Sequence, residues 1–148
     1  MSFVAAAPAA TLPDLPHHPF WPAINPGDCR ALMQLDGTVS NPRLIHALTE
    51  AVVSVNHDLK AWRLQQTAAT LEDVDDDEGQ ERLPFLYRRA VYETAAADLM
   101  ERYLRFDATG DAQNRAEQQE PAIEDHRRNA FWAIRDLKGE ARSTIELI

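Results

Sequence analysis

The sequence is poor in several features on which whole classes of protein depend. Its single cysteine, Cys29, excludes an internal disulfide framework and any metal site built from several cysteines. Only five glycines occur in 148 residues, and no apolar run approaches the roughly 20 residues that a membrane-spanning helix needs. The first residues lack the basic region and long apolar stretch of a secretion signal. With 45% hydrophobic and 26% charged residues, the sequence predicts a soluble, helix-rich, cytoplasmic domain.

Positive charge is also scarce, because 15 lysines and arginines stand against 24 acidic residues and leave a net charge of −9. Phosphate binding needs clustered lysines and arginines, so this balance opposes tight binding of nucleic acid or of an anionic membrane. It does not oppose passive contact with DNA. The sequence therefore disfavours a DNA-binding module but remains compatible with contact to passing DNA.

Two Asn-Pro steps indicate where the first two helices begin. The residue before a proline prefers extended geometry, as a helix N-cap does, and proline suits the first helical position. Asn25 should therefore cap a helix that starts at Pro26 and ends near Leu35, with Cys29 as a small core residue. Asn41 should cap a second helix in the same way.

The spacing of apolar residues extends this prediction to four helices. The second helix is predicted over about 42–66, with one apolar face: Leu44, Leu48, Val52, Val55, Leu59 and Trp62. The third is predicted from Pro84 onward, with one apolar side: Leu86, Ala90, Thr94, Ala97, Met100 and Leu104. The fourth ends near Gly139 and brings into phase Ile123, Ala130, Ile134 and Leu137. It begins either at Pro121 or, with a kink at that proline, near residue 112.

The predicted fold class is all-α, a small four-helix bundle-like domain over 24–139 with an extension at each end. Residues 1–23 form an extended, proline-rich arm, in which Phe20 and Trp21 can anchor to the domain or to a neighbouring molecule. Residues 140–148 form an extended tail whose apolar side chains are Ile145, Leu147 and Ile148. Because exposed apolar side chains are costly, the tail should pack on this domain or add to a partner's surface.

No pattern in the sequence points to catalysis, a cofactor or a metal ion. His46 and His57 share one face of the second predicted helix but lie about 16 Å apart, too far to hold one ion. The acidic segment 72–78 is no calcium loop, because Glu78 and Pro84 stand where that loop needs glycine and a bidentate glutamate. The sequence also lacks the common nucleophile, phosphate-binding and dinucleotide motifs. We therefore expect no enzymatic activity and no cofactor.

Trp132 is the aromatic residue most suited to an interface. On an ideal helix it points about 200° away from Ala130, off the seam that Ala130 and Ile134 share. Aromatic residues off the core are enriched in protein interfaces. Trp132 therefore either faces a partner or packs on a second face of this domain.

Three blocks of the sequence carry a family resemblance: FWPAINPGDCRALMQLDGTVSNPRLIHALTEAV, YRRAVYETAAADLMERYLRFDAT and NAFWAIRDLKGEARSTIELI. In this order they resemble the head completion, or head stabilisation, proteins of P2-like contractile-tailed temperate bacteriophages. The most specific features are the aromatic-Pro-x-Ile opening, Thr38-Val39 before Arg43-Leu44, and the Arg-x-Thr-Ile-Glu-Leu-Ile tail. Two features depart from the family: Pro121 falls where plain helix is expected, and the arm before Phe20 has no counterpart.

The resemblance implies a structural virion protein of the phage neck, present in the host cytoplasm during assembly. Such proteins form a ring of about twelve copies beneath the portal, extend the DNA channel and offer a docking surface to the neck or tail-completion protein. The implied partners are copies of itself, the portal, that neck component and DNA passing without tight binding, with no membrane. Its candidate contact residues are Phe20, Trp21, Trp132, Arg142, Ile145, Leu147 and Ile148.

Two further hypotheses join the resemblance to the residues. Part of the acidic segment 72–78 faces the channel or a neighbouring subunit, and the tail 142–148 inserts against the portal. The alternative function is that of a soluble helical assembly chaperone or regulator that binds one protein partner transiently. Neighbouring genes for portal, capsid and terminase would favour the structural role.

Overall fold

The computed structural model describes residues 11–106 and 112–141, with side-chain positions over 11–102 and 120–141. Within these ranges the chain is helical and forms no strand, which confirms the predicted all-α class. The elements are α1 (Pro26–Leu32), α2 (Asn41–Asp58), α3 (Lys60–Leu64), the short 3-10 helix η1 (Leu71–Asp73), α4 (Arg82–Phe106) and α5 (Ala112–Leu137). Among the described residues, no helix combines the length and apolarity that crossing a membrane requires.

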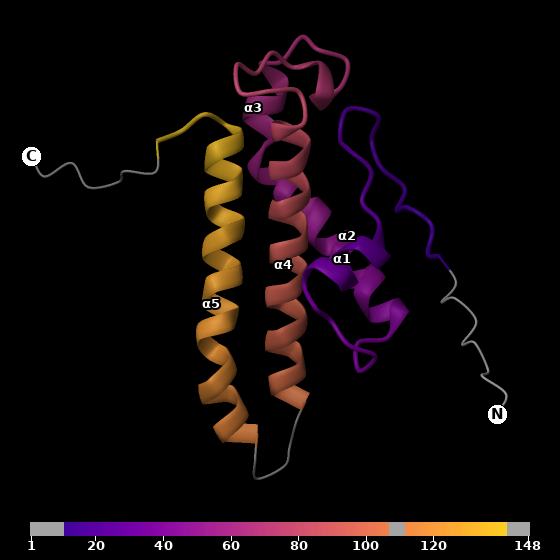
Figure 1. Ribbon diagram of the computed structural model, residues 1–148, viewed down its shortest axis with the longest axis vertical. Coiled ribbons are helices and arrows are strands. Elements are labelled where there is room, and N and C mark those ends of the chain that lie inside the picture. The colour runs from indigo at the N-terminus through magenta and orange to yellow at the C-terminus, as the bar shows by residue number, and fades with distance from the viewer. Residues whose placement is uncertain (1–10, 107–111, 142–148) are drawn as a thin grey trace, which may run out of the picture.

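The long helix α4 is the central element of the bundle. Figure 1 shows it between α5 on one side and α1 and α2 on the other, with α3 near the end where α4 begins. It packs most extensively against α5 and then against α2. Buried side chains therefore lie on several of its faces: Leu83, Leu86, Tyr87, Ala90, Val91, Tyr92, Ala95, Ala96, Ala97 and Leu99. Of the side predicted from the sequence, Leu86, Ala90 and Ala97 are buried. Burial extends to further faces, because helices cover α4 from two directions.

The first helix begins as predicted and ends early. Asn25 is its N-cap, with a side-chain Oδ1 that accepts hydrogen bonds from the backbone N–H groups of Gly27 (2.8 Å) and Asp28 (3.3 Å). The helix ends at Leu32 instead of near Leu35, because Gln34 takes the left-handed conformation (φ 54°). The N–H groups of Gln34 and Leu35 then bond back to the carbonyls of Ala31 and Arg30, which is the Schellman arrangement.

The second predicted helix needs two corrections. Its N-cap is Ser40 rather than Asn41, since the Ser40 hydroxyl accepts from the N–H of Arg43 (3.4 Å). Asn41 is already helical, and its Oδ1 accepts from Arg30 (2.8 Å) instead. The helix also does not continue unbroken to residue 66, because it is divided at Leu59 (φ −91°, ψ −1°) into α2 and α3.

The predicted apolar face of this second helix is confirmed as part of the core. Four of its side chains are completely or almost completely buried: Leu44, Leu48, Val55 and Leu59. The other two, Val52 and Trp62, are partly buried and pack against the same core. Cys29 of α1 is also fully buried there, as its small apolar side chain predicted.

The last helix takes the longer of the two predicted courses. α5 begins at Ala112 and runs through Pro121, and Ile123, Ala130 and Leu137 are buried along it. It ends at the predicted glycine, because Gly139 (φ 74°) takes the left-handed conformation. The N–H groups of Gly139 and Glu140 bond to the carbonyls of Asp136 and Arg135, a second Schellman arrangement that turns the chain away from the helix axis.

Candidate interaction surfaces

Phe20 and Trp21 anchor the proline-rich segment to this domain. Both side chains are buried, and the Trp21 ring stacks on Tyr87 of α4 with ring centroids 4.7 Å apart and 8° between the planes. The Arg63 guanidinium lies 3.9 Å above the Phe20 ring, and the N–H of Leu71 donates to the Phe20 carbonyl (2.9 Å). The sequence left open whether Phe20 and Trp21 pack on this domain or on a neighbouring molecule, and in the structure they pack on this domain. These two aromatics therefore lie beneath the surface of the described chain.

Trp132 lies on α5 beside an aromatic residue that reaches further into solvent. Its ring meets that of Phe131 edge to face, with centroids 5.4 Å apart. Phe131 is 51% exposed, and the Arg135 guanidinium lies 5.4 Å from its ring centre. Trp132 itself is half-buried. The structure thus brings Trp132 into an aromatic patch formed by Phe131, Trp132 and Arg135, which we call the α5 patch.

The remaining candidate contact residues, Arg142, Ile145, Leu147 and Ile148, lie outside the described residues. The last described residue, Ala141, marks the place from which they continue. Its carbonyl accepts a hydrogen bond from Arg135 (3.0 Å), and Glu140 forms an ion pair with Arg135 (3.4 Å). The side chain of Arg82, at the start of α4, donates to the carbonyl of Asp136 (3.4 Å). The described chain therefore ends beside Arg135 of α5, and Figure 1 shows its last residues leading away from α4.

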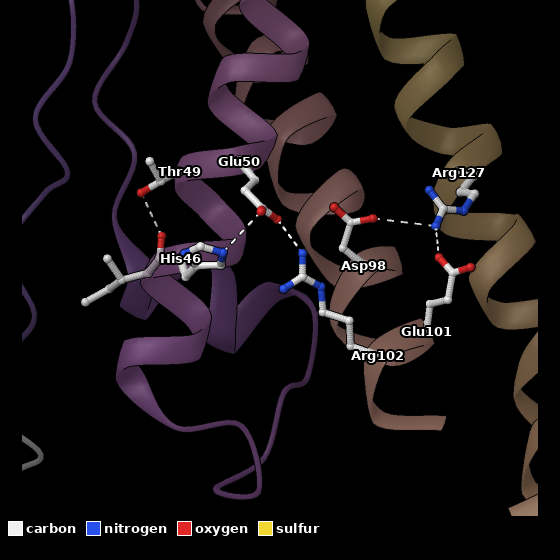
Figure 2. Close-up of polar contacts among 8 residues, drawn as sticks. His46, Thr49, Glu50, Asp98, Glu101, Arg102 and Arg127 are labelled. Atoms are coloured by element: carbon white, nitrogen blue, oxygen red, sulfur yellow. Dashed lines mark hydrogen bonds and ion pairs between the residues drawn. The ribbon is translucent and has the colours of Figure 1, made fainter. Parts of the chain in front are cut away.

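Ion pairs between charged side chains link α2 to α4 and α4 to α5 near the C-terminal end of α4 (Figure 2). On α2, Glu50 pairs with His46 (3.1 Å) and accepts from Arg102 of α4 (2.7 Å). Arg127 of α5 pairs with Asp98 of α4 (3.5 Å) and also with Glu101. Partial burial raises the pKa of Asp98, and the positive charges of Arg127 and Arg102 oppose that rise. Sequence patterns gave no sign of these links, since the partners are far apart in the chain.

A buried polar contact joins α4 and α5 nearer the middle of the bundle. Glu93 is 7% exposed, forms an ion pair with His126 and accepts from the side-chain amide of Asn129 (3.3 Å). A buried carboxylate is costly unless it is paired and hydrogen-bonded, and Glu93 has both kinds of partner. His126 therefore belongs to the interface between α4 and α5. The signal available in the sequence was an acidic residue within the apolar run of α4.

The acidic segment 72–78 lies at the end of the bundle where α4 begins. Asp76 and Glu78 pair with Arg82 (3.2 and 2.7 Å), while Glu72, Asp73 and Asp77 are exposed. Within the described ranges, no group of three or more histidine, cysteine or acidic side chains is placed to hold a metal ion. The segment is therefore a solvated acidic surface that one arginine fixes to the start of α4.

A groove of about 460 Å³ lies between α1 and α4. Its lips carry two large apolar side chains in solvent, Leu32 (65% exposed) and Phe85 (60% exposed). Its remaining lining residues are Asp28, Met33, Glu81, Arg88, Arg89, Tyr92 and Glu93. This groove was not predictable from the sequence, because its lining comes from two helices and depends on where α1 ends and how it packs on α4.

The notable side chains of the described residues make packing contacts, ion pairs between helices and open surface patches. This arrangement is typical of a structural or assembly protein, whose function lies in its surfaces. The family model described as phage head completion protein (GPL) matches residues 15–148. The chain belongs to this family of structural phage proteins, which confirms the resemblance seen in its three sequence blocks.

One relative extends the match over nearly the whole chain. The head completion/stabilization protein of Escherichia phage P2 is 33% identical over 150 residues, which cover 98% of this chain and 89% of that protein. No solved structure matches the chain at a significant level.

Proposed function

We propose that this protein completes the phage head as a ring beneath the portal, of about twelve copies. The ring extends the DNA channel and presents a docking surface to the next neck or tail-completion component. Membership of the head completion family, which spans residues 15–148, is the observation that carries this proposal. The role is one of assembly, in the virion and earlier in the host cytoplasm, and uses no catalytic chemistry.

The charge of the chain suits contact with DNA that must pass freely. With a net charge of −9, the surface repels phosphate groups. DNA that slides past it therefore meets no strong binding sites. The exposed side chains of Glu72, Asp73 and Asp77 concentrate acid at one end of the bundle. We place this end of the bundle toward the channel or toward the neighbouring subunit.

Contacts between copies and with the portal fall on the surfaces that the fold leaves open. A ring requires two different patches on each subunit, because a head-to-tail interface joins unlike surfaces. The α5 patch, with Phe131 exposed and Trp132 half-buried, has the aromatic composition of an interface centre and is our candidate for one of them. The tail 142–148 is our candidate for the contact with the portal.

Imaging of the neck in assembled particles tests the proposal directly. We expect density for this chain as a ring between portal and tail, in particles that carry DNA. A matched sample of particles with Trp132→Ala and Phe131→Ala should lose the ring while the isolated protein keeps its helical circular dichroism. Absence of the chain from purified particles would contradict the proposal and would favour a transient assembly chaperone.

A further inference from the structure

The groove between α1 and α4 combines exposed apolar lips with an acid that has no ion pair. Leu32 and Phe85 face solvent at its lips, although most large apolar side chains of the described chain are buried. Glu81 lies one helical turn before Phe85, whose N–H donates to the Glu81 carbonyl (3.1 Å). The Glu81 side chain is exposed and forms no ion pair within the described ranges. The groove therefore suits an apolar side chain that has a positive charge beside it.

The α5 patch of the same chain is a surface of the complementary kind. Phe131 is 51% exposed, and three of the four residues one turn away from it on α5 are arginines: Arg127, Arg128 and Arg135. Arg128 pairs with Asp125 of its own helix (3.1 Å), and both of these side chains are more than half exposed. An ion pair so open to water contributes little. Arg128 can therefore turn toward a carboxylate on another molecule.

The groove and the α5 patch lie on different sides of the subunit. On α5, Ala133 and Leu137 are buried against the domain, while Phe131 reaches solvent. The groove opens between α1 and α4, and Figure 1 shows α1 and α5 on opposite sides of α4. One copy thus cannot place its patch in its own groove, but it can place the patch in the groove of the next copy. Such a head-to-tail contact is the kind that closes into a ring.

We propose that neighbouring copies in the ring join through these two surfaces. Phe131 of one copy enters the groove of the next, between Leu32 and Phe85, and Arg128 pairs with Glu81. Arg128 precedes Phe131 by three residues, about 4.5 Å, and Glu81 precedes Phe85 by four, about 6 Å. Both contacts therefore form together when α5 of one copy runs parallel to α4 of the next. This inference rests on the proposed ring and specifies the second of its two unlike surfaces.

Disulfide trapping in purified phage particles tests the contact. The particles carry a Glu81→Cys, Arg128→Cys variant, so that every copy has one thiol on each surface and keeps the apolar contacts. Oxidation should give a ladder of cross-linked multimers in non-reducing electrophoresis, because each copy links to two neighbours. Both positions are exposed, and the native Cys29 is fully buried. A control with Val53→Cys in place of Glu81→Cys should give no ladder.

Charge reversal tests the pairing of Glu81 with Arg128. Either Glu81→Arg or Arg128→Glu alone should lower the amount of this chain in purified particles at least about tenfold, because each places like charges together. The two reversals together restore opposite charges and should return that amount to within about twofold of the original. Circular dichroism of the isolated variants should show unchanged helix content, which separates assembly from folding.

The outcomes distinguish this contact from other arrangements. A chain that is present in particles but gives no ladder would overturn the inference and leave the proposed ring in place. Cross-linked dimers from Arg128→Cys alone would also overturn it, because they would join patch to patch. A double reversal that fails to restore the chain to particles would do the same. Absence of the original chain from particles would instead overturn the proposed function and this inference together.

Discussion

At the scale of single residues, Asn25 has two structural roles: it caps α1 and it binds the segment that precedes the helix. Its Oδ1 accepts from two N–H groups of α1, and its side-chain amide donates to the carbonyl of Leu12 and to Asp14 (both 2.9 Å). One side chain thus starts a helix and holds the preceding segment against it. The sequence predicted the first role from the Asn-Pro step, but the second depends on contacts with residues more than ten positions away.

Two substitutions at Asn25 separate these roles. Asn25→Ala removes both and should lower the free energy of unfolding by about 1 to 2 kcal/mol. Asn25→Ser keeps an accepting oxygen for the cap and removes the amide donor without adding a charge beside Asp14, so most of the stability should remain while residues 11–14 become easier to cleave. Urea unfolding measures the first effect, and limited proteolysis with mass spectrometry measures the second. Equal stability of the two variants would show that the cap contributes nothing.

Cys29 gives the protein a defined response to alkaline pH. Burial raises the pKa of its thiol from 9.0 to about 12, against a smaller lowering by Arg30. The folded state therefore holds this proton more tightly than the unfolded state does. Its stabilising effect is complete below pH 9 and is lost as the pH rises from 9 toward 12.

Comparison with a Cys29→Ala variant isolates this effect from other titrating groups, including Tyr87, whose pKa burial also raises. Between pH 7 and pH 10, the original protein should lose about 1.4 kcal/mol more than the variant in the free energy of unfolding. Urea unfolding at the two pH values measures the difference. Parallel losses in both proteins would mean that the thiol ionises equally well when folded.

At the scale of helices, sequence spacing predicted the existence of the long elements and most of the face of α2. It was less successful at their ends, for local reasons. Gln34 ends α1 in a backbone conformation that usually favours glycine, and Arg30 binds Asn41, so that Ser40 becomes the cap of α2. The groove and the ion pairs of Figure 2 join residues of different helices, which no periodic pattern within one helix can reveal.

The α2 face provides a matched pair for testing the core. Val55 is 1% exposed and Val53 is 66% exposed, two positions apart on one helix. Val55→Asp buries a charge without a partner and should leave the domain unfolded at 25 °C. Val53→Asp makes the same chemical change in solvent and should alter the free energy of unfolding by less than about 0.5 kcal/mol. Circular dichroism at 222 nm and urea unfolding compare the two, and a folded Val55→Asp protein would contradict the assigned packing.

At the scale of the whole molecule, the described residues form one helical body, and we propose residues 142–148 as a separate contact element. The Schellman arrangement at Gly139 ends α5 before residue 142, so the proposed contact element lies outside the described helices. Stability and assembly should therefore be separable functions of the chain. The family and the relative from phage P2 indicate a structural role in head completion, and the fold shows which surfaces are exposed to solvent.

Removal of residues 142–148 tests this separation. The shortened protein should keep its helical circular dichroism, and its melting temperature should fall by no more than a few degrees. Phage that carry only the shortened protein should yield few stable heads, because the proposed contact with the portal is lost. A charge-neutral control, Ser143→Ala with Thr144→Ala, should leave both properties intact. Normal phage yield from the shortened protein would remove the tail from the assembly role.

The central position of α4 also has a mechanical consequence. Two contacts tie α2 to it along its length, from Tyr87 to Asn56 (2.7 Å) and from Arg102 to Glu50 (2.7 Å), while α5 covers another side. Tension applied along the axis of α4 loads the α2–α4 and α4–α5 interfaces in shear at the same time. Close-packed side chains deform little under such a load. The bundle should therefore resist stretching along its length more strongly than peeling of α5 sideways, the direction in which contacts separate one after another.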